Sequence, residues 1–510
     1  MKTLMLGILL FGSLLAQEVV ELKLPNTNKV TLKLMFKNGT VCDPAGKEGL
    51  TYLTSALIMQ GGTGSLTYAD IQNKIYPWAA GYSSSVDKEV SIFTFEVHQD
   101  FLNDFYPILK GLLLNPSFSQ NDFDRVKRNQ QNYVDQVIRA SSDEDYSKKA
   151  LEDFLFRGTK YQHMIQGKSE SVKAITLEDV RDQYKNFFTK NNVMIGIAGN
   201  YSSAFLSTLK KDLQNLSAIK HLLPAIVKPQ MPKGINVEII QKDNAFGSAI
   251  FAGFPMNLTR KDNDFAAMMV ANSYLGEHRK SYGQLYQKLR ETRSMNYGDY
   301  SYIEWYDNGG RNMLQPAGTP RTTNYFSFWI RPVQIAKQLK NQYKELEDIK
   351  IGHAHYAIRL AVREIDNLVK NGMTKKDFEA TRTFLRSYIK LYVQTPASRL
   401  GYLMDSKFYG KKDYVNEMDK QLAKLSLADV NKAIKKYWQA ENMCVTIVTD
   451  KSEAEPLAKS LKENLTSPMS YSNIVKAGLP KEVLNEDDAV ANFKLNVNEV
   501  KIINSADTFK

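Results

Sequence analysis

Cysteine is scarce in this chain. Only Cys42 and Cys444 occur among 510 residues. Two cysteines cannot build a disulfide framework or a thiolate zinc site. They are either two free, small apolar side chains or a single bridge, and their positions in the sequence do not decide between these alternatives.

Long hydrophobic runs are also missing, with one exception at the start. After Lys2, the stretch from Leu4 to Ala16 carries no charge, and Gln17-Glu18 ends it. A basic start, a short apolar core and a small final residue are typical of a secretory signal, whereas the stretch is too short for a comfortable membrane span. We therefore expect residues 1–16 to be a signal peptide and the mature protein to be secreted or periplasmic, without a membrane span.

Several catalytic signatures are absent as well. The chain has no G-x-S-x-G, Walker-A or dinucleotide-binding motif. A net charge of +12 is compatible with nucleic acid, an anionic membrane surface or acidic partners. No zinc finger, helix-turn-helix or aromatic–basic motif accompanies that charge, so nucleic-acid binding is the least favoured use. The 43% hydrophobic and 24% charged composition is that of an ordinary globular protein.

The chain contains an internal repeat. Ile175–Val180 resembles Leu425–Val430 at an offset of 250 residues, and Asp122-Phe123 resembles Asp377-Phe378 at an offset of 255. The 250-residue offset also pairs further segments: Phe187-Phe188 with Tyr437-Trp438, and Asn192–Ala198 with Asn442–Val448. Ordered matches of this kind predict two homologous halves.

The repeat predicts the domain organisation and the fold class. A segment with Pro224, Pro229 and Pro232 reads as a stiff linker. Strand patterns followed by several helices, twice over, indicate an α+β protein whose halves each consist of a mostly antiparallel sheet covered by helices and are joined by this linker. The expected parts are the signal peptide 1–16, an N-terminal half 17–220, the linker 221–235, a C-terminal half 236–470 and a C-terminal extension 471–510.

An ordered set of short segments resembles a known family. The segments are Lys47–Leu57, Gly61–Thr63, Tyr82–Ser85, Asn115–Phe118, Asn192–Asn200 and Leu289–Tyr297. Together they are similar to the pitrilysin/insulinase-type zinc peptidases (inverzincins), most closely to the processing-peptidase branch. Active members carry H-x-x-E-H on a helix, which places two histidines on one face to bind Zn²⁺ with a glutamate between them as general base.

The resemblance implies that this chain has lost the zinc site. Carried over position by position, the two histidines fall on Tyr52 and Ala56, the general base on Ser55, and the distal glutamate ligand at or beside Tyr133. Alanine has no ligand atom, and neutral tyrosine and serine are poor zinc ligands. We expect the helix to survive as packing through Leu50, Leu53 and Leu57, and the chain to bind no cofactor.

One other histidine pair deserves consideration as a metal site. His353-Ala-His355 is the only close pair among six histidines. A spacing of two does not place both rings on one helix face. The favoured interpretation is that both are cap-region or surface histidines.

The later half keeps a pair that the resemblance marks as functional. Active relatives place an arginine and a tyrosine, seven residues apart, opposite the zinc, and these positions correspond to Arg290 and Tyr297. A tyrosine O–H and a guanidinium can polarise a scissile carbonyl and stabilise its oxyanion. From residue types alone, Arg290 reads as a common helical arginine and Tyr297 as the start of a tyrosine-rich strand.

The retained pair and the lost ligands suggest a division of labour. The resemblance implies a partner subunit that supplies Arg290 and Tyr297 to a heterodimer, in which a secreted homologous chain binds the zinc and a peptide is the substrate. The alternative is a non-catalytic peptide-binding or scaffold protein of the same fold. Three further arginines, Arg311, Arg321 and Arg331, either line the chamber or are solvated charges.

Overall fold

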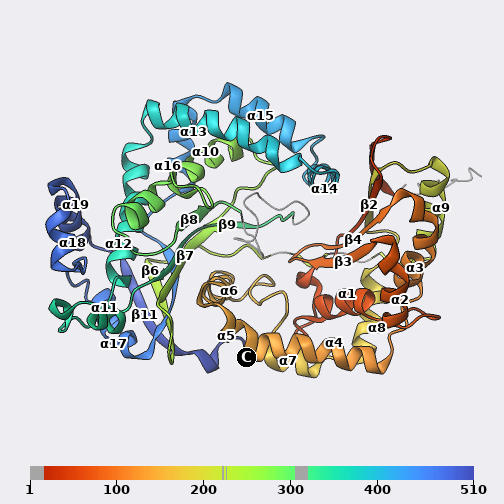
Figure 1. The fold of residues 1–510 in the computed structure, drawn as a ribbon, viewed down its shortest axis with the longest axis horizontal. Helices are drawn as coiled ribbons and strands as arrows, with labels where there is room; N and C mark the ends of the chain where they lie inside the picture. The colour runs from red at the N-terminus through yellow and green to blue at the C-terminus, as the bar shows by residue number, and fades with distance from the viewer. Residues whose placement is uncertain (1–16, 221–222, 226, 305–319) are drawn as a thin grey trace, which may run out of the picture.

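The computed structural model describes residues 17–220, 223–225, 227–304 and 320–510. The predicted signal peptide, three linker positions and Arg311 lie outside the described residues. Figure 1 shows two lobes, one from each half of the chain, which meet around helix α6 (Asp143–Leu155).

The N-terminal half is built on a five-stranded sheet with the order β1-β5-β2-β4-β3. Strands β1 and β5 are parallel, and the other neighbours are antiparallel. The strands are β1 (Glu18–Lys23), β2 (Lys29–Phe36), β3 (Gly81–Val86), β4 (Ser91–His98) and β5 (Val193–Gly199). Its apolar core includes the fully buried Leu34, Phe93 and Ile195.

Besides α6, eight α-helices accompany this sheet in the described part of the N-terminal half. They are α1 (Leu50–Gln60), α2 (Tyr68–Ile75), α3 (Leu102–Leu114), α4 (Gln120–Asn132), α5 (Ile138–Ser141), α7 (Ser169–Ala174), α8 (Leu177–Phe187) and α9 (Ser203–Leu213). Helices α1 and α3, among others, bury their apolar faces in the same core as the strands.

The C-terminal half repeats this plan and adds one strand. Its six-stranded sheet has the order β11-β6-β10-β7-β9-β8, with parallel pairing at β11-β6 and β6-β10. The strands are β6 (Ile235–Lys242), β7 (Ser248–Met256), β8 (Asp299–Tyr302), β9 (Asn324–Val333), β10 (Met443–Asp450) and β11 (Val497–Asn504). Without β11, the order matches the first sheet strand for strand.

Helices again surround the second sheet, as Figure 1 shows. They are α10 (Phe265–Gly276), α11 (Ala336–Gln342), α12 (Ala354–Asn371), α13 (Lys375–Tyr388), α14 (Pro396–Phe408), α15 (Tyr414–Lys424), α16 (Leu427–Tyr437), α17 (Lys451–Lys462), α18 (Asn473–Gly478) and α19 (Lys481–Ala491).

The repeat seen in the sequence corresponds to two helices, one in each half, that begin with the same capping motif. Thr176 caps α8 and Ser426 caps α16, each in a capping box with the aspartate three residues later. A capping box satisfies two backbone N–H groups at the start of a helix. The expected α+β class with two related halves is confirmed, and antiparallel pairs form the majority in both mixed sheets.

Each half lends one helix to the sheet of the other. Helix α6 packs on β7 and β10 of the C-terminal sheet, and α14 packs on β5 and β1 of the N-terminal sheet. Around α6 lies an apolar cluster that both halves share, which we call the inter-half cluster. It contains Val41, Cys42, Leu151, Leu155, Phe156, Phe251, Tyr325, Trp329 and Cys444, among others. Both cysteines are free and buried, which settles the two alternatives in favour of reduced thiols.

Buried charges also connect the halves. The turn between β3 and β4 contributes Asp87, which pairs with Arg321 of the C-terminal half. The neighbouring Lys88 pairs within the N-terminal half, at 2.5 Å from Glu152 of α6. Next to them, the Glu89 carboxylate accepts hydrogen bonds from the backbone N–H (2.9 Å) and the hydroxyl (2.6 Å) of Thr322. The charged side chains Asp87, Lys88, Glu89, Glu152 and Arg321 are almost inaccessible to water, so each ion pair is tightly confined, whereas Thr322 is exposed.

The end of the chain returns to the N-terminal half. After β11 joins β6, the Phe509 ring packs in a cluster with Ile138 and Tyr146. The Phe509 carbonyl accepts a hydrogen bond from Ser169 N–H at 2.9 Å, and Arg139 donates to the Ser505 carbonyl at 3.0 Å. The last fourteen residues therefore bridge the two halves. In the described part of the chain, no helix is both long enough and apolar enough to cross a bilayer.

Candidate functional site

Helix α1 carries two of the three zinc-ligand positions of active relatives, Tyr52 and Ala56, together with the general-base position, Ser55, and its start is rigidly built. Its N-cap, Gly49, has φ +97°, and a Cβ there would lie 2.5 Å from the Gln166 carbonyl oxygen. Glycine is required at such a position. The buried Asp43 carboxylate accepts hydrogen bonds from the N–H groups of Gly49 (2.7 Å) and Thr51 (2.8 Å). The predicted helix is confirmed.

The side chains on α1 serve packing. Tyr52 lies half-buried against the inter-half cluster, and Ala56 is buried in the N-terminal core. Ser55 is completely buried, and its hydroxyl has no hydrogen-bond partner. Within residues 17–220, 223–225, 227–304 and 320–510, no group of three His, Cys, Asp or Glu side chains is arranged to hold a metal ion. The residues at the family's zinc positions do not fit zinc.

Two π-helical segments occur in the described residues, and each contains one of the positions singled out by the sequence. Segment η4 (Tyr133–Val137) begins at the position of the distal glutamate, and η5 (Tyr286–Glu291) contains Arg290. A π-helix widens the backbone turn and re-aims side chains, and it occurs frequently at functional sites. The backbone at Tyr133 is thus π-helical, although tyrosine is a poor zinc ligand.

Arg290 and Tyr297 lie together. The Arg290 guanidinium lies over the ring of Tyr286 at 4.7 Å and over the ring of Tyr297 at 5.8 Å from the ring centroid. Leu285 and Leu289, on the opposite side of the same turn, are completely buried and anchor it. The expected helical position of Arg290 is confirmed, in π form.

Tyr297 projects from a turn that three neighbours hold. Ser294 has φ +54°, Asn296 donates a hydrogen bond to the Arg331 carbonyl at 3.0 Å, and Gly298 has φ +157°. The Tyr297 side chain is 78% exposed. The sequence placed Tyr297 at the start of a strand, but β8 begins only at Asp299, because the Gly298 turn precedes it.

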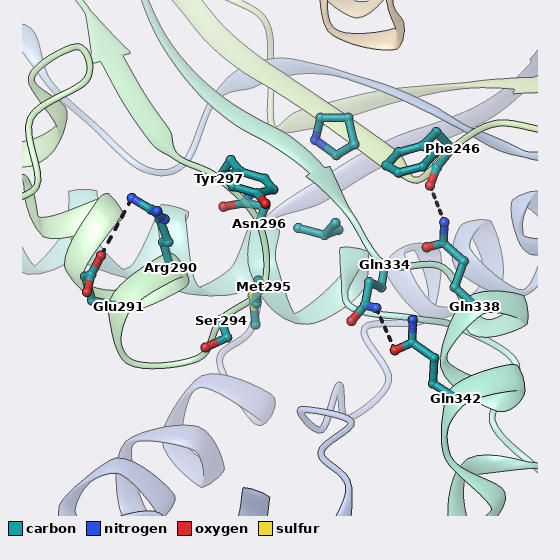
Figure 2. Close-up of a pocket in the computed structure, with 12 residues that line it drawn as sticks. Phe246, Arg290, Glu291, Ser294, Met295, Asn296, Tyr297, Gln334, Gln338 and Gln342 are labelled. Carbon is teal, nitrogen blue, oxygen red and sulfur yellow. Dashed lines mark hydrogen bonds and ion pairs between the residues drawn. The ribbon is translucent and has the colours of Figure 1, made fainter.

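The pair faces a cavity of ≈ 670 Å³. As Figure 2 shows, Arg290, Glu291, Ser294 and Tyr297 line one side of it, and Phe246 with a row of glutamines lines the other. The remaining lining residues are Met295, Asn296, Pro332, Val333, Gln334, Gln338 and Gln342. Among the described lining residues, only Arg290 and Glu291 carry a formal charge, and their side chains lie 3.7 Å apart.

A buried acid lies behind the turn. Asp299 accepts a hydrogen bond from Asn296 at 2.7 Å, and its second oxygen has no partner. Burial raises the pKa of Asp299 well above its usual range, although Arg331 and Arg290 oppose this shift.

The second candidate metal pair is structural. His353 is the N-cap of α12 and bonds the Ser470 carbonyl at 3.1 Å, and His355 contacts the Ser460 hydroxyl at 3.3 Å. Burial lowers their pKa values to about 4 and about 3. The cap-region interpretation holds for His353, but neither histidine lies on the surface, because both are buried against α17 and the residues that follow it as far as Ser470.

The flanking arginines have different environments. Arg321 is buried in its ion pair with Asp87, which corrects the interpretation as a solvated charge. Arg331 lies on β9 with its guanidinium 2.8 Å from the Glu144 carboxylate. Sequence reasoning missed Phe246 and the glutamines of the cavity. The only available signal was the four-residue spacing of Gln334, Gln338 and Gln342.

With this geometry in place, comparison with known proteins defines the class. Residues 18–168 match the family described as "Insulinase (Peptidase family M16)", and residues 174–385 match "Peptidase M16 inactive domain". The chain belongs to the M16 insulinase family, and it is a member without the zinc-site residues.

Individual relatives extend over nearly the whole chain. "Non-peptidase homolog YmxG" of Helicobacter pylori is 22% identical over 88% of this chain and 98% of its own length. "Uncharacterized zinc protease YmxG" of Bacillus subtilis is 19% identical over 80% of this chain and 90% of its own length. A crystal structure of "peptidase M16 inactive domain" from Pseudomonas fluorescens has the same fold, with a TM-score of 0.71 and 17% identity over 86% of this chain and 96% of that one.

Proposed function

We propose that this protein is a non-catalytic chain of an M16-type peptidase pair, which supplies Arg290 and Tyr297 in trans to a secreted homologue that binds zinc. The observation that carries the proposal is an asymmetry. The zinc positions hold packing side chains, whereas Arg290 and Tyr297 are neighbours at the mouth of a solvent-accessible cavity. A side chain that is 78% exposed, such as Tyr297, can reach a second chain.

The chemistry of the pair follows from its donors. The Tyr297 hydroxyl would donate a hydrogen bond to the carbonyl oxygen of the bound peptide and to the oxyanion that develops from it. The Arg290 guanidinium would add a positive charge and a planar set of N–H donors beside it. The metal that activates water would be held by the partner chain, because this chain lacks its ligands.

The test uses the full chain combined with an M16 homologue that carries an intact H-x-x-E-H. We expect Arg290→Ala and Tyr297→Phe each to lower kcat for peptide cleavage by about 10²–10³, the usual effect of removing one oxyanion donor. Tyr76→Phe is the matched control, because Tyr76 is an 85% exposed tyrosine that does not line the cavity. Full activity of both cavity variants would disprove the division of labour.

A second candidate is a non-catalytic peptide-binding or scaffold protein of the same fold. It is favoured by the name of one relative, "Non-peptidase homolog YmxG", which covers 88% of this chain. The two candidates differ in one readout. A scaffold would join the zinc-bearing homologue, or bind peptide, without raising the rate of peptide cleavage, whereas the proposed partner subunit raises that rate.

A further inference from the structure

The wall of the cavity opposite Arg290 is built from uncharged amides and an aromatic ring. Gln334, Gln338 and Gln342 follow one another at four-residue intervals along α11 and the residues before it, and all three line the cavity. Side chains four residues apart in a helix lie on one face. Figure 2 shows them in a row beside Phe246.

Internal hydrogen bonds fix this row and leave selected atoms available. Gln334 donates through Nε2 to Gln342 Oε1 at 3.1 Å, and Gln338 donates to the Phe246 carbonyl. In the part of the chain that the structure describes, Gln334 Oε1 and Gln342 Nε2 have no protein partner. The hydrogen bond between Gln334 and Gln342 holds both carboxamides in place. One acceptor, Gln334 Oε1, and one donor, Gln342 Nε2, therefore remain for a ligand.

The aromatic ring of the wall is exposed to an unusual degree. Phe246 is 81% exposed, and across the cavity Tyr297 is 78% exposed. Exposed large apolar groups that flank a cavity mark a binding site for another molecule. Aromatic and arginine side chains are also the residue types that contribute most to binding energy at interfaces.

The charges of the lining residues narrow the chemical class of ligand that suits the cavity. Arg290 and Glu291, which lie 3.7 Å apart, carry opposite charges, and the other ten described lining residues are uncharged. Such walls do not favour a phosphate or a polycation. Carboxamides, which carry both donors and acceptors, match the N–H and C=O groups of a peptide backbone.

We infer that Phe246, Gln334 and Gln342 form a peptide subsite that holds an uncharged extended segment by its main chain, with an apolar side chain between Phe246 and Tyr297. The inference rests on the proposed function for its ligand class, since it takes the cavity to be a peptide site. It goes further in naming the residues of the far wall and the uncharged, apolar character of the segment.

The test measures binding to the full chain alone, without a partner. Blocked pentapeptides with a central Leu, Lys or Glu are titrated by calorimetry. We expect the leucine peptide to bind, and the lysine and glutamate peptides to bind at least about tenfold more weakly. Phe246→Ala and Gln342→Ala should each weaken binding of the leucine peptide by about tenfold.

Matched controls separate binding from folding. Tyr76→Ala removes a similarly exposed aromatic outside the cavity, and Lys340→Ala changes an exposed position on α11 that does not line it. Both should bind the leucine peptide like the unmodified chain. Phe246 and Gln342 are exposed, so unchanged thermal unfolding of their variants is expected and verifies the fold.

The inference is overturned if none of the pentapeptides binds, if the charged peptides bind as tightly as the leucine peptide, or if the cavity variants bind like the controls. These outcomes do not depend on catalysis. Loss of cleavage in Arg290→Ala with unchanged peptide binding in Phe246→Ala would uphold the proposed function and refute the subsite. Normal cleavage in Arg290→Ala with weakened binding in Phe246→Ala would do the reverse.

Discussion

At the scale of single residues, the position of Tyr297 depends on neighbouring residues that hold the turn but take no part in the proposed catalysis. Asn296 Nδ2 donates both to Asp299 and to the Arg331 carbonyl, while its Oδ1 accepts from Gly298 N–H at 3.1 Å. A Cβ on Gly298 would lie 2.2 Å from the Tyr300 hydroxyl oxygen. These contacts restrain the backbone of the turn from which the Tyr297 side chain projects.

A second residue, Glu453, anchors α11, the helix that forms the cavity wall opposite Tyr297. This buried glutamate on α17 accepts a hydrogen bond at 2.7 Å from the backbone N–H of Ala336, the first residue of α11. Burial raises the pKa of Glu453 from its ordinary value of 4.5 to about 7. The helix with the glutamine row is thus tied to a carboxyl group that holds its proton more tightly in the folded protein than in the unfolded chain.

The sign of the resulting pH dependence follows directly. Because the folded pKa is the higher one, the stabilisation from Glu453 protonation is complete below about pH 4.5 and is lost as the pH rises to about 7, a difference of about 3 kcal/mol. Glu453→Gln cannot titrate but still accepts from Ala336. Denaturant unfolding should show the free energy of the unmodified chain falling relative to Glu453→Gln between pH 4.5 and 7.5. A constant difference over that range would contradict the raised pKa.

The sequence predicted the part of the site whose residues lie close together along the chain. The seven-residue spacing of Arg290 and Tyr297 needs only one turn and one loop, and the structure brings the two together. Phe246 reaches the cavity from the loop between β6 and β7, and Gln342 from α11. Only the pairing of β7 with β9 makes them neighbours of Tyr297, and no local pattern encodes that pairing.

At the scale of secondary-structure elements, the two sheets differ at one edge. Strand β1 ends its sheet, whereas its counterpart β6 is covered by β11 over seven residue pairs. The alternation of apolar and polar residues in β2 and the capping box of α8 are signals that lie within the element itself, and such signals indicated the order of strands and helices. No pattern within residues 497–504 indicated that they add a strand, because that strand pairs only with β6.

Removing the C-terminal strand and tail should therefore affect more than the last residues. Deletion of 497–510 exposes the backbone edge of β6 and removes the Phe509 ring from its cluster with Ile138 and Tyr146. We expect a lower melting temperature and concentration-dependent association, because an open edge strand pairs with other chains.

Phe509→Ala alone separates the two effects. It keeps β11 and should lower the free energy of unfolding by about 3 kcal/mol without promoting association. Light scattering and thermal unfolding of both variants provide the check. A deletion variant that stays monomeric and melts normally would show that the tail contributes nothing to holding the halves.

At the scale of the whole molecule, the two halves meet through charges that water hardly reaches. Arg321 and Asp87 are both nearly inaccessible, and Thr322 beside them donates to Glu89. The resemblance to active relatives pointed to a clamshell, but it did not indicate which groups hold its parts together. Those contacts join residues more than 230 positions apart.

Breaking this pair should be costly. Arg321→Ala leaves Asp87 buried without its partner, so we expect the free energy of unfolding to fall by about 3–5 kcal/mol. Arg331→Ala is the control, because its pair with Glu144 is one-third exposed and should change the free energy of unfolding by less than about 1 kcal/mol. Denaturant titration of both variants compares them. Equal effects would mean that the Asp87–Arg321 pair gains nothing from its burial.

The exchange of α6 and α14 sets the order in which the molecule can be completed during synthesis. When residue 220 has been made, the strands of the first sheet all exist, but the helix that packs on β5 and β1 is still unmade until residue 408. Until then that face of the sheet is open, and Val20, Leu22, Met35 and Met194, which pack with Leu400 and Met404 of α14, are exposed to water or to other chains. The first half is thus synthesised by residue 220, but its fold is completed only when α14 has been made. For nearly two hundred residues of further synthesis, its open sheet face needs protection from aggregation.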